Sequence, residues 1–533
     1  MFEYGNESLD RIEKIKKLKE SWVIVYANNY HGKQDISEVA KNNSNLKEVE
    51  IFQESGAEKK YQIAGRLMSY KSHGKLAFAK VMDQSGTLQI CFMKDKFQFH
   101  TGKDLVDSLI IDGEEKTAYK ISEKFINVWD YIGVKWDLFL TKHGELTLFV
   151  SEFQILSKAI RPLPEKFHWV TDQETLYRQR YLDMIMNDDS YQRFVLRSKF
   201  VRALRDFYEE NRFFEVETPV LGNAASGAAA APFITHHNDF DEEYFLRISP
   251  ETFLKRITVW RFERVVEFTR NFRNEGSDPS HIQEFSAIEH YAAWWNFEDN
   301  MKFTEEMFEY IFTKVPQLKK EVLVKDKAWV EKLVNFQTPW QRIDYVEWIK
   351  KVCGIDVSKY FIGDEEKLRA DIKAVWVEFE GMNQMVVPTL IDYLFKKVLR
   401  PSIVGPAFVY NYPKTMQPLA RQNDENPAIV DQFQLVVNGW EIIKAYSELV
   451  DPMIQKSNFD TQAKAKEMWD EEATSWDDDF VFAMEYAMPP QSGWWMWIER
   501  VFSILTEQDN LRDVVLFPLM KSVKKDENKK EEN

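Results

Sequence analysis

Arg270–Trp294 reads RNFRNEGSDPSHIQEFSAIEHYAAW, two arms joined by the turn signal GSDPS. On a strand, residues two apart project from one face, so Arg273 and Glu275 share a face of the first arm. The returning arm carries His281, Phe285, Glu289 and Tyr291. A guanidinium can grip a phosphate with two hydrogen bonds, and an aromatic ring can stack on a base. The stretch therefore predicts a nucleotide site, although an exposed hairpin held by ion pairs explains the same spacing equally well.

The composition around this stretch is that of a globular protein with more than one domain: 533 residues, 44% hydrophobic and 29% charged. No apolar run approaches the ~18 residues of a membrane span, and the N-terminus lacks the apolar core of a signal peptide. Two cysteines, Cys91 and Cys353, form no metal or disulfide framework and fit a reducing cytosol. We therefore expect a cytoplasmic protein with no membrane contact. The net charge of −16 argues against non-specific nucleic-acid binding but leaves room for a local basic face.

The chain divides into five parts, which together predict an α+β fold. Residues 1–60 form a helical extension, with an exposed amphipathic helix over residues 7–20 whose lysines face solvent. Short alternating strands at 61–156 predict a small β-barrel. A polar linker covers 157–190. Long helices mixed with strands follow at 191–521, and 522–533 is a charged, disordered tail.

Further acids stand out beyond the opening stretch. Glu441 and Glu448 are seven residues apart, so a helix would place both on one face, whereas a strand would need a bulge to do so. A hard cation such as Mg²⁺ would relieve their repulsion, but solvated helix acids are the commoner explanation. Glu251 follows a proline at an expected helix start, where a carboxylate either stabilises the helix or contacts a ligand.

Several motifs together resemble the class II aminoacyl-tRNA synthetases. FRNEG…H…EF…E.Y resembles their second signature, FFEVETPVL (Phe213–Leu221) the first, and ER…LRDVVLFPLMK (Glu499–Lys521) the third. The segments RPLPEKFH, YRQRYLD and PFITHHN narrow the resemblance to the lysyl-tRNA synthetases over about residues 35–521. The resemblance implies an OB-fold barrel that binds the anticodon, an antiparallel-sheet catalytic domain flanked by helices, and a homodimer.

The same resemblance implies the partners and the site residues. Lysine, ATP and tRNA(Lys) would be the substrates, with Mg²⁺ held by Glu441 and Glu448. Arg273 would bind the α-phosphate, Glu275 and His281 would support the nucleotide, and Phe285 and Arg500 would lie on the two faces of adenine. Gly227 and Glu289 would hold the substrate's α-amino group, while Glu251 and Tyr291 would recognise the lysine side chain. In the barrel, Lys71, Phe78 and Gln89 would contact the anticodon; Lys71 stands where the family usually has Arg.

Tryptophan replaces glycine at family positions. In QSGWWMWIER, Trp495 and Trp497 stand at two glycines of the third signature, and Trp129, Trp136, Trp169 and Trp260 show the same exchange. Trp22, Trp329, Trp348, Trp376, Trp469 and Trp476 also lie in turn-like or polar contexts. Trp294, Trp295, Trp340, Trp440 and Trp494 read as genuine tryptophans. Since glycine lets backbone approach a ligand, we hypothesise that UGA codons meaning glycine have been translated as tryptophan.

Three functions fit these observations. The first is an active lysyl-tRNA synthetase with glycine at those positions. The second is a catalytically impaired homologue that binds RNA or regulates, if the tryptophans are real. The third is a related enzyme that lysylates a protein, but such enzymes resemble the catalytic half only, so the barrel at 61–156 counts against it. RPLPEKFH and PFITHHN favour lysine over aspartate or asparagine.

Overall fold

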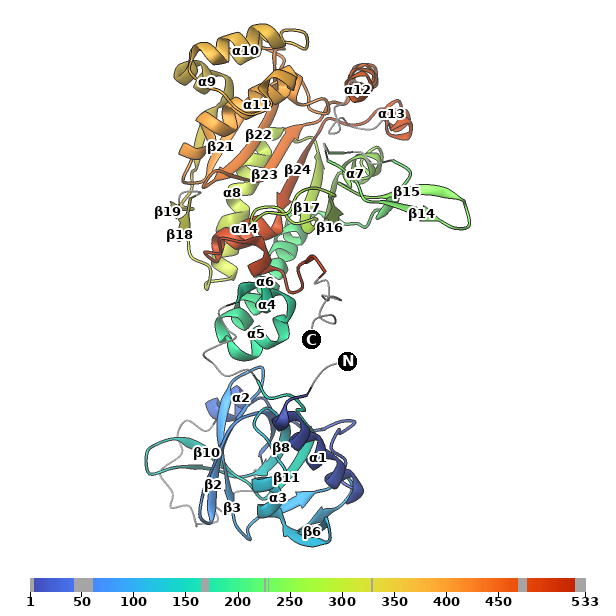
Figure 1. Cartoon of the computed structure of the whole chain (residues 1–533). Coiled ribbons are helices and arrows are strands. Elements are labelled where there is room, and N and C mark those ends of the chain that lie inside the picture. The colour runs from blue at the N-terminus through green and yellow to red at the C-terminus, as the bar shows by residue number, and fades with distance from the viewer. Residues whose placement is uncertain are drawn as a thin grey trace, which may run out of the picture. The chain divides into compact units, whose positions relative to one another are not determined.

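The computed structural model describes residues 4–42, 61–163, 172–224, 227–228, 230–326, 329–467 and 477–522, and the side chains of 461–467 are excluded. The chain forms two compact units, Met1–Trp169 and Val170–Asn533 (Figure 1). Trp169, Trp469, Trp476 and all of the predicted tail except Ser522 lie outside the described residues. No helix in the described ranges is long and apolar enough to cross a bilayer.

In its described residues, the first unit is a β-barrel with three helices. Its helices are α1 (Asn6–Glu20), α2 (Ile36–Asn42) and α3 (Ala118–Lys124). Its strands are β1 (Tyr61–His73), β2 (Leu76–Met82), β3 (Thr87–Met93), β4 (Gln98–His100), β5 (Leu105–Val106), β6 (Ser108–Ile111), β7 (Glu114–Thr117), β8 (Tyr131–Trp136), β9 (Leu138–Leu140), β10 (Leu146–Phe149) and β11 (Glu152–Ser157). Nine of them form one curled sheet in the order β5-β4-β11-β8-β1-β2-β3-β10-β9, while β6 and β7 pair separately.

Alternation along the strands builds the barrel. In β2, Ala77, Ala79 and Val81 are buried while the residues between them face outward. Leu88, Ile90 and Phe92 continue the buried row on β3. A half-buried strand requires this period of two, so the barrel predicted for 61–156 follows from the sequence pattern.

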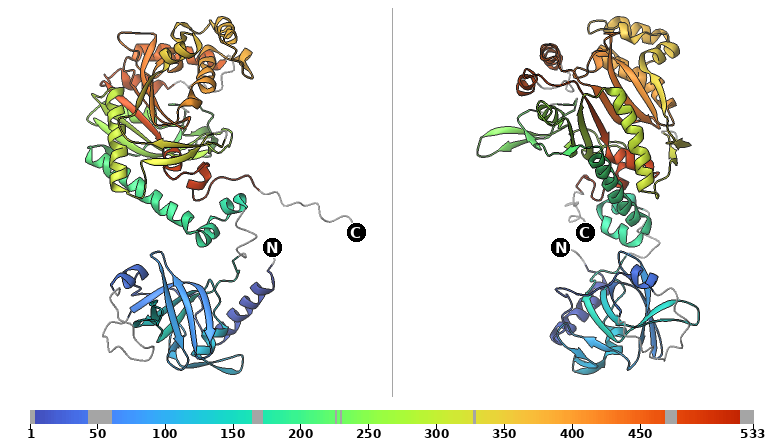
Figure 2. Two further views of the ribbon diagram at one scale, coloured as in Figure 1. Left: turned by 90° about the vertical axis from the view of Figure 1, so that its left-hand side faces the viewer. Right: turned by 180° about the vertical axis from the view of Figure 1, so that it is seen from behind.

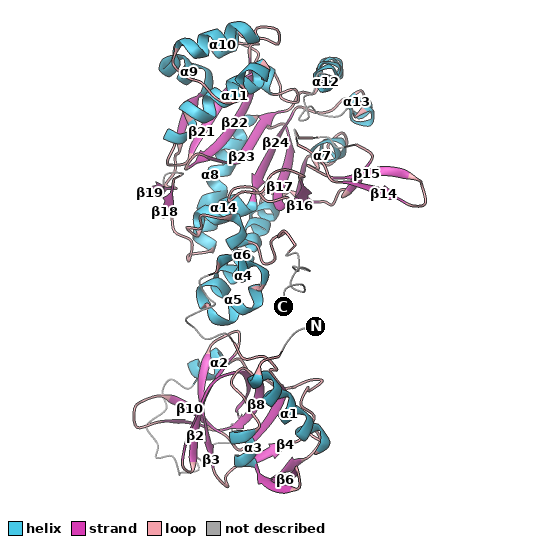
Figure 3. Ribbon diagram, in the orientation of Figure 1, coloured by secondary structure: helices cyan, strands magenta, loops and turns pink. Residues whose placement is uncertain are grey.

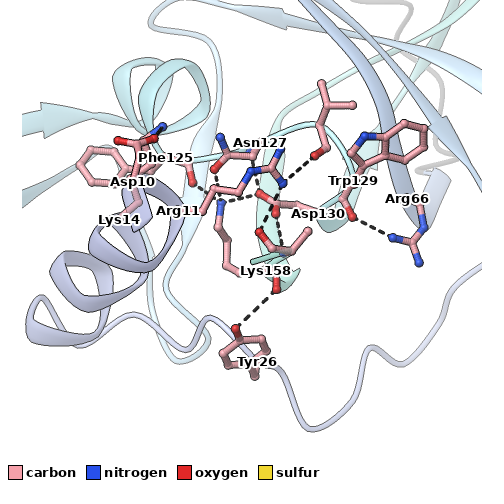
Figure 4. A network of polar contacts seen from close by, with 12 residues as sticks. Asp10, Arg11, Lys14, Tyr26, Arg66, Phe125, Asn127, Trp129, Asp130 and Lys158 are labelled. Carbon is pink, nitrogen blue, oxygen red and sulfur yellow. Dashed lines mark hydrogen bonds and ion pairs between the residues drawn. The ribbon is translucent and has the colours of Figure 1, made fainter. Parts of the chain in front are cut away.

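Helix α1 is amphipathic, as its spacing predicted, and one of its buried residues is charged. Its Arg11 is buried and donates hydrogen bonds to the carbonyls of Val128 (3.2 Å) and Ala159 (3.3 Å) (Figure 4). Beside it, the buried ammonium of Lys158 pairs with the buried carboxylate of Asp130. Burial is the largest influence on the pKa of Lys158 and lowers it. The buried face of the helix thus combines the hydrogen bonds of Arg11 with the apolar side chains of Ile15 and Leu18, which pack into the barrel core.

The second unit contains the remaining elements. Its helices are α4 (Gln173–Arg178), α5 (Arg180–Met186), α6 (Asp188–Glu210), α7 (Glu251–Ile257), α8 (Phe297–Lys314), α9 (Tyr345–Cys353), α10 (Glu365–Ala374), α11 (Val387–Val398), α12 (Pro452–Glu467), α13 (Asp478–Met484) and α14 (Ile498–Leu505). Its strands are β12 (Phe214–Glu215), β13 (Leu221–Gly222), β14 (Ile234–His237), β15 (Glu242–Leu246), β16 (Arg264–Phe272), β17 (Glu284–Ala293), β18 (Glu321–Lys325), β19 (Glu331–Asn335), β20 (Gln341–Asp344), β21 (Ala407–Pro413), β22 (Ile429–Val437), β23 (Trp440–Ser447) and β24 (Gln491–Trp497).

An eight-stranded sheet organises this unit, in the order β12-β16-β17-β24-β23-β22-β21-β20 (Figures 2 and 3). The six inner strands run antiparallel, and β12 and β20 add parallel pairs at the edges. One face forms the core with α6, α8 and α14, where Ile288, Trp494 and Met496 are buried. This arrangement confirms the α+β class and leaves the other face for a site.

The opening stretch folds as β16, a loop and β17. Both strands are shorter than the predicted arms, because β16 ends at Phe272 and β17 begins at Glu284. Arg273, Glu275 and His281 therefore lie in the loop, and the strand argument for a shared face of Arg273 and Glu275 was wrong. Phe285, Glu289 and Tyr291 lie on one face of β17, as predicted for Glu289 and Tyr291.

Tryptophan is common in left-handed backbone conformations. Of fifteen non-glycine residues with positive φ among those described, six are tryptophan: Trp22, Trp129, Trp136, Trp294, Trp329 and Trp376. A bulky residue in this region is an outlier, whereas glycine adopts it freely. Two sequence interpretations change. Trp294 (φ 70°) belongs with the glycine-like positions, and Trp348 lies within α9, not in a turn.

Candidate active site

A cavity of about 240 Å³ opens on the face of the large sheet opposite the core formed with α6, α8 and α14. Its lining includes six of the predicted residues: Gly227, Glu251, Arg273, Glu289, Tyr291 and Glu441. They come from α7, β17, β23, the segment between β13 and β14, and the loop that follows β16. The sheet thus collects residues up to 214 positions apart in the sequence (441 − 227) at one site.

Arg273 presents a positive charge to this cavity. Burial lowers the pKa of its guanidinium, and the carboxylates of Glu275, Glu289 and Glu441 act in the opposite direction. No ion pair within 4.0 Å joins Arg273 to a carboxylate in the described residues, and its buried Nε has no hydrogen-bond partner there. A guanidinium with unused donors is suited to an anionic ligand such as a phosphate.

An indole lies between the two residues predicted to enclose adenine. The rings of Phe285 and Trp497 are stacked, with centroids 3.9 Å apart and planes 28° apart. On the other side, the guanidinium carbon of Arg500 lies 4.2 Å from the Trp497 ring centroid. Burial lowers the pKa of Arg500 to about 10. The ring of Phe285 and the guanidinium of Arg500 therefore form the two walls of a flat slot, and the indole of Trp497 fills it.

The two faces of β24 differ sharply. Trp494 and Met496 enter the core, while Gly493, Trp495 and Trp497 alternate on the ligand face. A Cβ on Gly493 would lie 2.3 Å from Oε1 of Glu448 and 2.4 Å from the Tyr291 ring, so only glycine fits there. The two tryptophans occupy the same face, and the buried Nε1 of Trp495 has no hydrogen-bond partner among the described residues.

Acidic side chains gather at the other end of the cavity. Ser249 Oγ donates to Glu289 (3.0 Å), and burial raises the pKa of Glu289 well above its ordinary value. Gly227 has φ 86°, and a Cβ on it would lie 2.8 Å from that of Glu251. Glu251 begins α7 after Pro250, as predicted, and its carboxylate is buried. The close approach of Gly227 keeps this end of the cavity narrow.

Two residues of this acidic end were missed from the sequence. Lys255, one helical turn after Glu251, is 1% exposed and places its Nζ 2.6 Å from Glu251 Oε1. Tyr446 donates its hydroxyl to the same oxygen at 2.5 Å. Burial alone would lower the pKa of Lys255, but the carboxylates of Glu251 and Glu448 outweigh it and raise the pKa. The i,i+4 spacing of Glu251 and Lys255 was visible, but it is equally typical of an exposed helix pair.

Glu441 and Glu448 lie at opposite ends of β23. A bulge opposite Leu435 and Val436 shifts the alternation, so Glu441 faces the cavity like Lys444 and Tyr446. The bulge that a strand required is therefore present. About seven residues of strand, roughly 20 Å of backbone, separate the two glutamates, and Glu448 forms an ion pair with Lys255.

Two further predicted residues lie outside the cavity lining. Glu275 is exposed, and His281 pairs with Asp278 through Nδ1 at 2.8 Å. In the other unit, the three predicted anticodon contacts share one outward strip. Lys71 pairs directly with Phe78 across β1 and β2. Gln89 on β3 pairs with Lys80, two residues beyond Phe78.

Comparison with known proteins agrees with this organisation. The family model "tRNA synthetases class II (D, K and N)" matches residues 172–521, and "OB-fold nucleic acid binding domain" matches residues 61–156. The chain belongs to the class II tRNA synthetases.

Similar curated proteins indicate which family within this class the chain belongs to. The lysine–tRNA ligase of Aquifex aeolicus is 42% identical over 463 residues, which cover 87% of this chain and 73% of the relative. Those of Carboxydothermus hydrogenoformans (37%; 96% and 97% covered) and Wolinella succinogenes (38%; 97% and 96% covered) align almost end to end. Within its class, the chain is a member of the lysine–tRNA ligase family.

Proposed function

We infer that the chain attaches L-lysine to tRNA(Lys) with ATP, through a lysyl-adenylate. The observation that carries this inference is one cavity with an unpaired guanidinium at one end and a buried acidic cluster at the other. The first suits the phosphates of ATP, and the second suits a cationic side chain. The impaired-homologue alternative receives no support from the relatives, and the OB-fold unit disfavours a protein substrate.

The chemistry needs no protein nucleophile. The lysine carboxylate attacks the α-phosphorus of ATP and pyrophosphate leaves. A hydroxyl of the terminal ribose of the tRNA then attacks the lysyl carbonyl, and AMP leaves. Arg273 would neutralise charge on the α-phosphate, and Phe285 and Arg500 would hold adenine between them. Glu289 and Gly227 would fix the α-amino group. Catalysis then rests on positioning and charge stabilisation.

Magnesium fits the Glu441 end of the cavity. No cluster of three metal-ligating side chains occurs among the described residues, so the ion would take most of its ligands from phosphates and water, as Mg²⁺ commonly does. It would supply charge neutralisation on the phosphates. Glu441 is the favoured protein ligand. The predicted share of Glu448 is disfavoured, because Glu448 lies at the far end of β23 and pairs with Lys255.

We further propose that the natural chain carries glycine at positions 495 and 497. Trp497 fills the slot required for adenine, and six other tryptophans adopt the backbone region that glycine prefers. The codons at 129, 136, 169, 260, 495 and 497 should be UGA, and the native peptide Gly493–Arg500 should have the mass of its glycine form. UGG codons and a tryptophan-containing peptide would refute this proposal.

A homodimer built on the first signature is also proposed. In and after the edge strand β12, Phe214 is 59% exposed, Val220 40% and Leu221 44%. Exposed apolar side chains in and after an edge strand are suited to contact with a second copy. Sedimentation of the chain should give a dimer, and Phe214→Asp should shift it toward the monomer.

The central test is aminoacylation. The chain with glycine at 495 and 497 should form lysyl-tRNA from lysine, ATP and tRNA(Lys), with pyrophosphate exchange that depends on lysine. Aspartate and asparagine should not replace lysine. Exchange with either of them, or tRNA binding by a folded chain without any exchange, would refute the inferred function.

A further inference from the structure

The acidic end of the cavity already contains a lysine of the chain itself. The Nζ of Lys255 lies between the carboxylates of Glu251 and Glu448. Three rings surround it, with centroids 5.8 Å away for Tyr291 and 5.5 Å for both Tyr446 and Phe480. An ammonium held by acids and aromatic faces shows directly that this environment accepts a lysine side chain.

We propose that Lys255 is a positioning residue for the lysine substrate, which orients the recognition carboxylates toward the incoming side-chain ammonium. This inference rests on the proposed function and deepens it. It assigns to Lys255 a specificity role without contact to the reacting atoms.

The hydrogen bonds to Glu251 give the orientation. Both Lys255 Nζ and Tyr446 OH bind Oε1, at 2.6 and 2.5 Å. No described residue donates to Oε2, although Glu251 lines the cavity. With Oε1 held from two sides, Oε2 is the oxygen available to a ligand. Lys255 thus decides which oxygen the substrate meets.

Glu448 depends on Lys255 even more strongly. Its side chain is fully buried, and neither carboxylate oxygen has a well-directed hydrogen bond among the described residues, so the ion pair with Lys255 is its main compensation. Glu251, Glu289 and Glu448 place three acidic groups at this end of the cavity against the one ammonium of Lys255. A second ammonium, from the substrate, finds acidic partners here, whereas an uncharged side chain leaves buried charge unpaired, which is costly.

Lysine binding to the full-length chain tests this directly, without ATP. Equilibrium dialysis with labelled lysine should show that Lys255→Met weakens binding roughly 10- to 100-fold, the effect of one charged hydrogen bond. Lys255→Arg should keep most of the affinity. Lys396→Met, which breaks the 2.6 Å i,i+4 pair with Asp392 on α11, is the matched control and should bind lysine normally.

Norleucine, which lacks the side-chain ammonium, separates positioning from packing. The preference for lysine over norleucine should shrink in Lys255→Met by about the same factor as lysine affinity. If Lys255→Met does not fold, Lys255→Arg should still prefer lysine. Equal weakening of both ligands in either variant, or unchanged lysine affinity in folded Lys255→Met, would overturn the inference. An unaltered chain that binds no lysine would instead contradict the proposed function.

Discussion

Trp497 lies in the space that a nucleotide base requires, so its replacement should restore binding. We expect Trp495→Gly with Trp497→Gly to raise lysine-dependent pyrophosphate exchange roughly 5- to 100-fold, since a stacked base contributes about 1–3 kcal/mol and the indoles exclude it. Trp494→Gly is the control on the opposite face of β24. It should cost about 3–5 kcal/mol of stability and give no exchange. A folded double variant without exchange would contradict this assignment.

Replacing a tryptophan of positive φ by glycine should stabilise the folded chain. Trp376 has φ 60° and is 95% exposed, so its ring gains little from packing. Trp376→Gly should stabilise the chain by about 1 kcal/mol, because a Cβ in this region costs roughly 1–2 kcal/mol. Urea denaturation would measure the change.

The comparison for that prediction is Trp348, which lies in helix α9 and packs against the neighbouring core. Trp348→Gly should destabilise the chain, since glycine in a helix interior alone costs about 1 kcal/mol relative to alanine. Equal effects of the two substitutions would show that backbone conformation does not distinguish these tryptophans.

We expect the stability of the folded chain to depend on pH through His290, which lies in strand β17. Its ring is buried between Tyr208 OH (2.9 Å) and Asn300 Oδ1 (2.8 Å), and burial lowers its pKa from 6.5 to about 3. Below pH 6.5 the imidazole of His290 is therefore protonated in the unfolded chain but stays neutral in the folded chain. This group should cost about 2 kcal/mol of stability between pH 7 and 5, at roughly 1.4 kcal/mol per pH unit.

Denaturation of His290→Gln at both pH values would measure this contribution. The variant should lose less stability on acidification than the unaltered chain, whereas the exposed His143→Gln should behave as the unaltered chain does. An unchanged pH dependence in His290→Gln would assign the acid sensitivity to other groups.

Local patterns predicted elements better than they predicted their ends. The alternation of apolar residues predicted the barrel, and helical spacing predicted α1. Both strands predicted in Arg270–Trp294 were longer than the strands of the structure. The loop around Arg273 bends where its backbone begins to bond with distant segments, such as Ala231, which accepts from the amide of Asn274. The bulge in β23 likewise depends on its partner strand. Such long-range contacts leave no trace in the local sequence.

The proposed function assigns tRNA binding to the barrel and lysine activation to the second unit. A substitution in the barrel should therefore impair tRNA binding without impairing lysine activation. Phe78→Ala on the outward strip of the barrel should raise the tRNA concentration needed for aminoacylation roughly 5- to 100-fold, since base stacking contributes about 1–3 kcal/mol. Lysine-dependent pyrophosphate exchange should stay unchanged, because its residues belong to the other unit. A parallel loss of exchange would contradict this division.

Sequence motifs named residues that the fold brings together, and the roles assigned to these residues stay predictions. Six predicted residues line one cavity, and Phe285 and Arg500 enclose the slot beside it. Lys255 and Tyr446 were missed, because their importance comes from a carboxylate that folding brings between them. Glu275 and His281 lie away from the cavity, and their proposed support of the nucleotide remains a prediction.

The large sheet has one face that packs against α6, α8 and α14 and another that carries the cavity, and this division has an evolutionary consequence. On β24, Trp494 and Met496 maintain the fold, while positions 493, 495 and 497 decide what enters the cavity. Selection can therefore alter one set of side chains while the other is inherited intact. One ancestral scaffold could in this way diverge toward several amino acids, and a single family description covers the D, K and N enzymes.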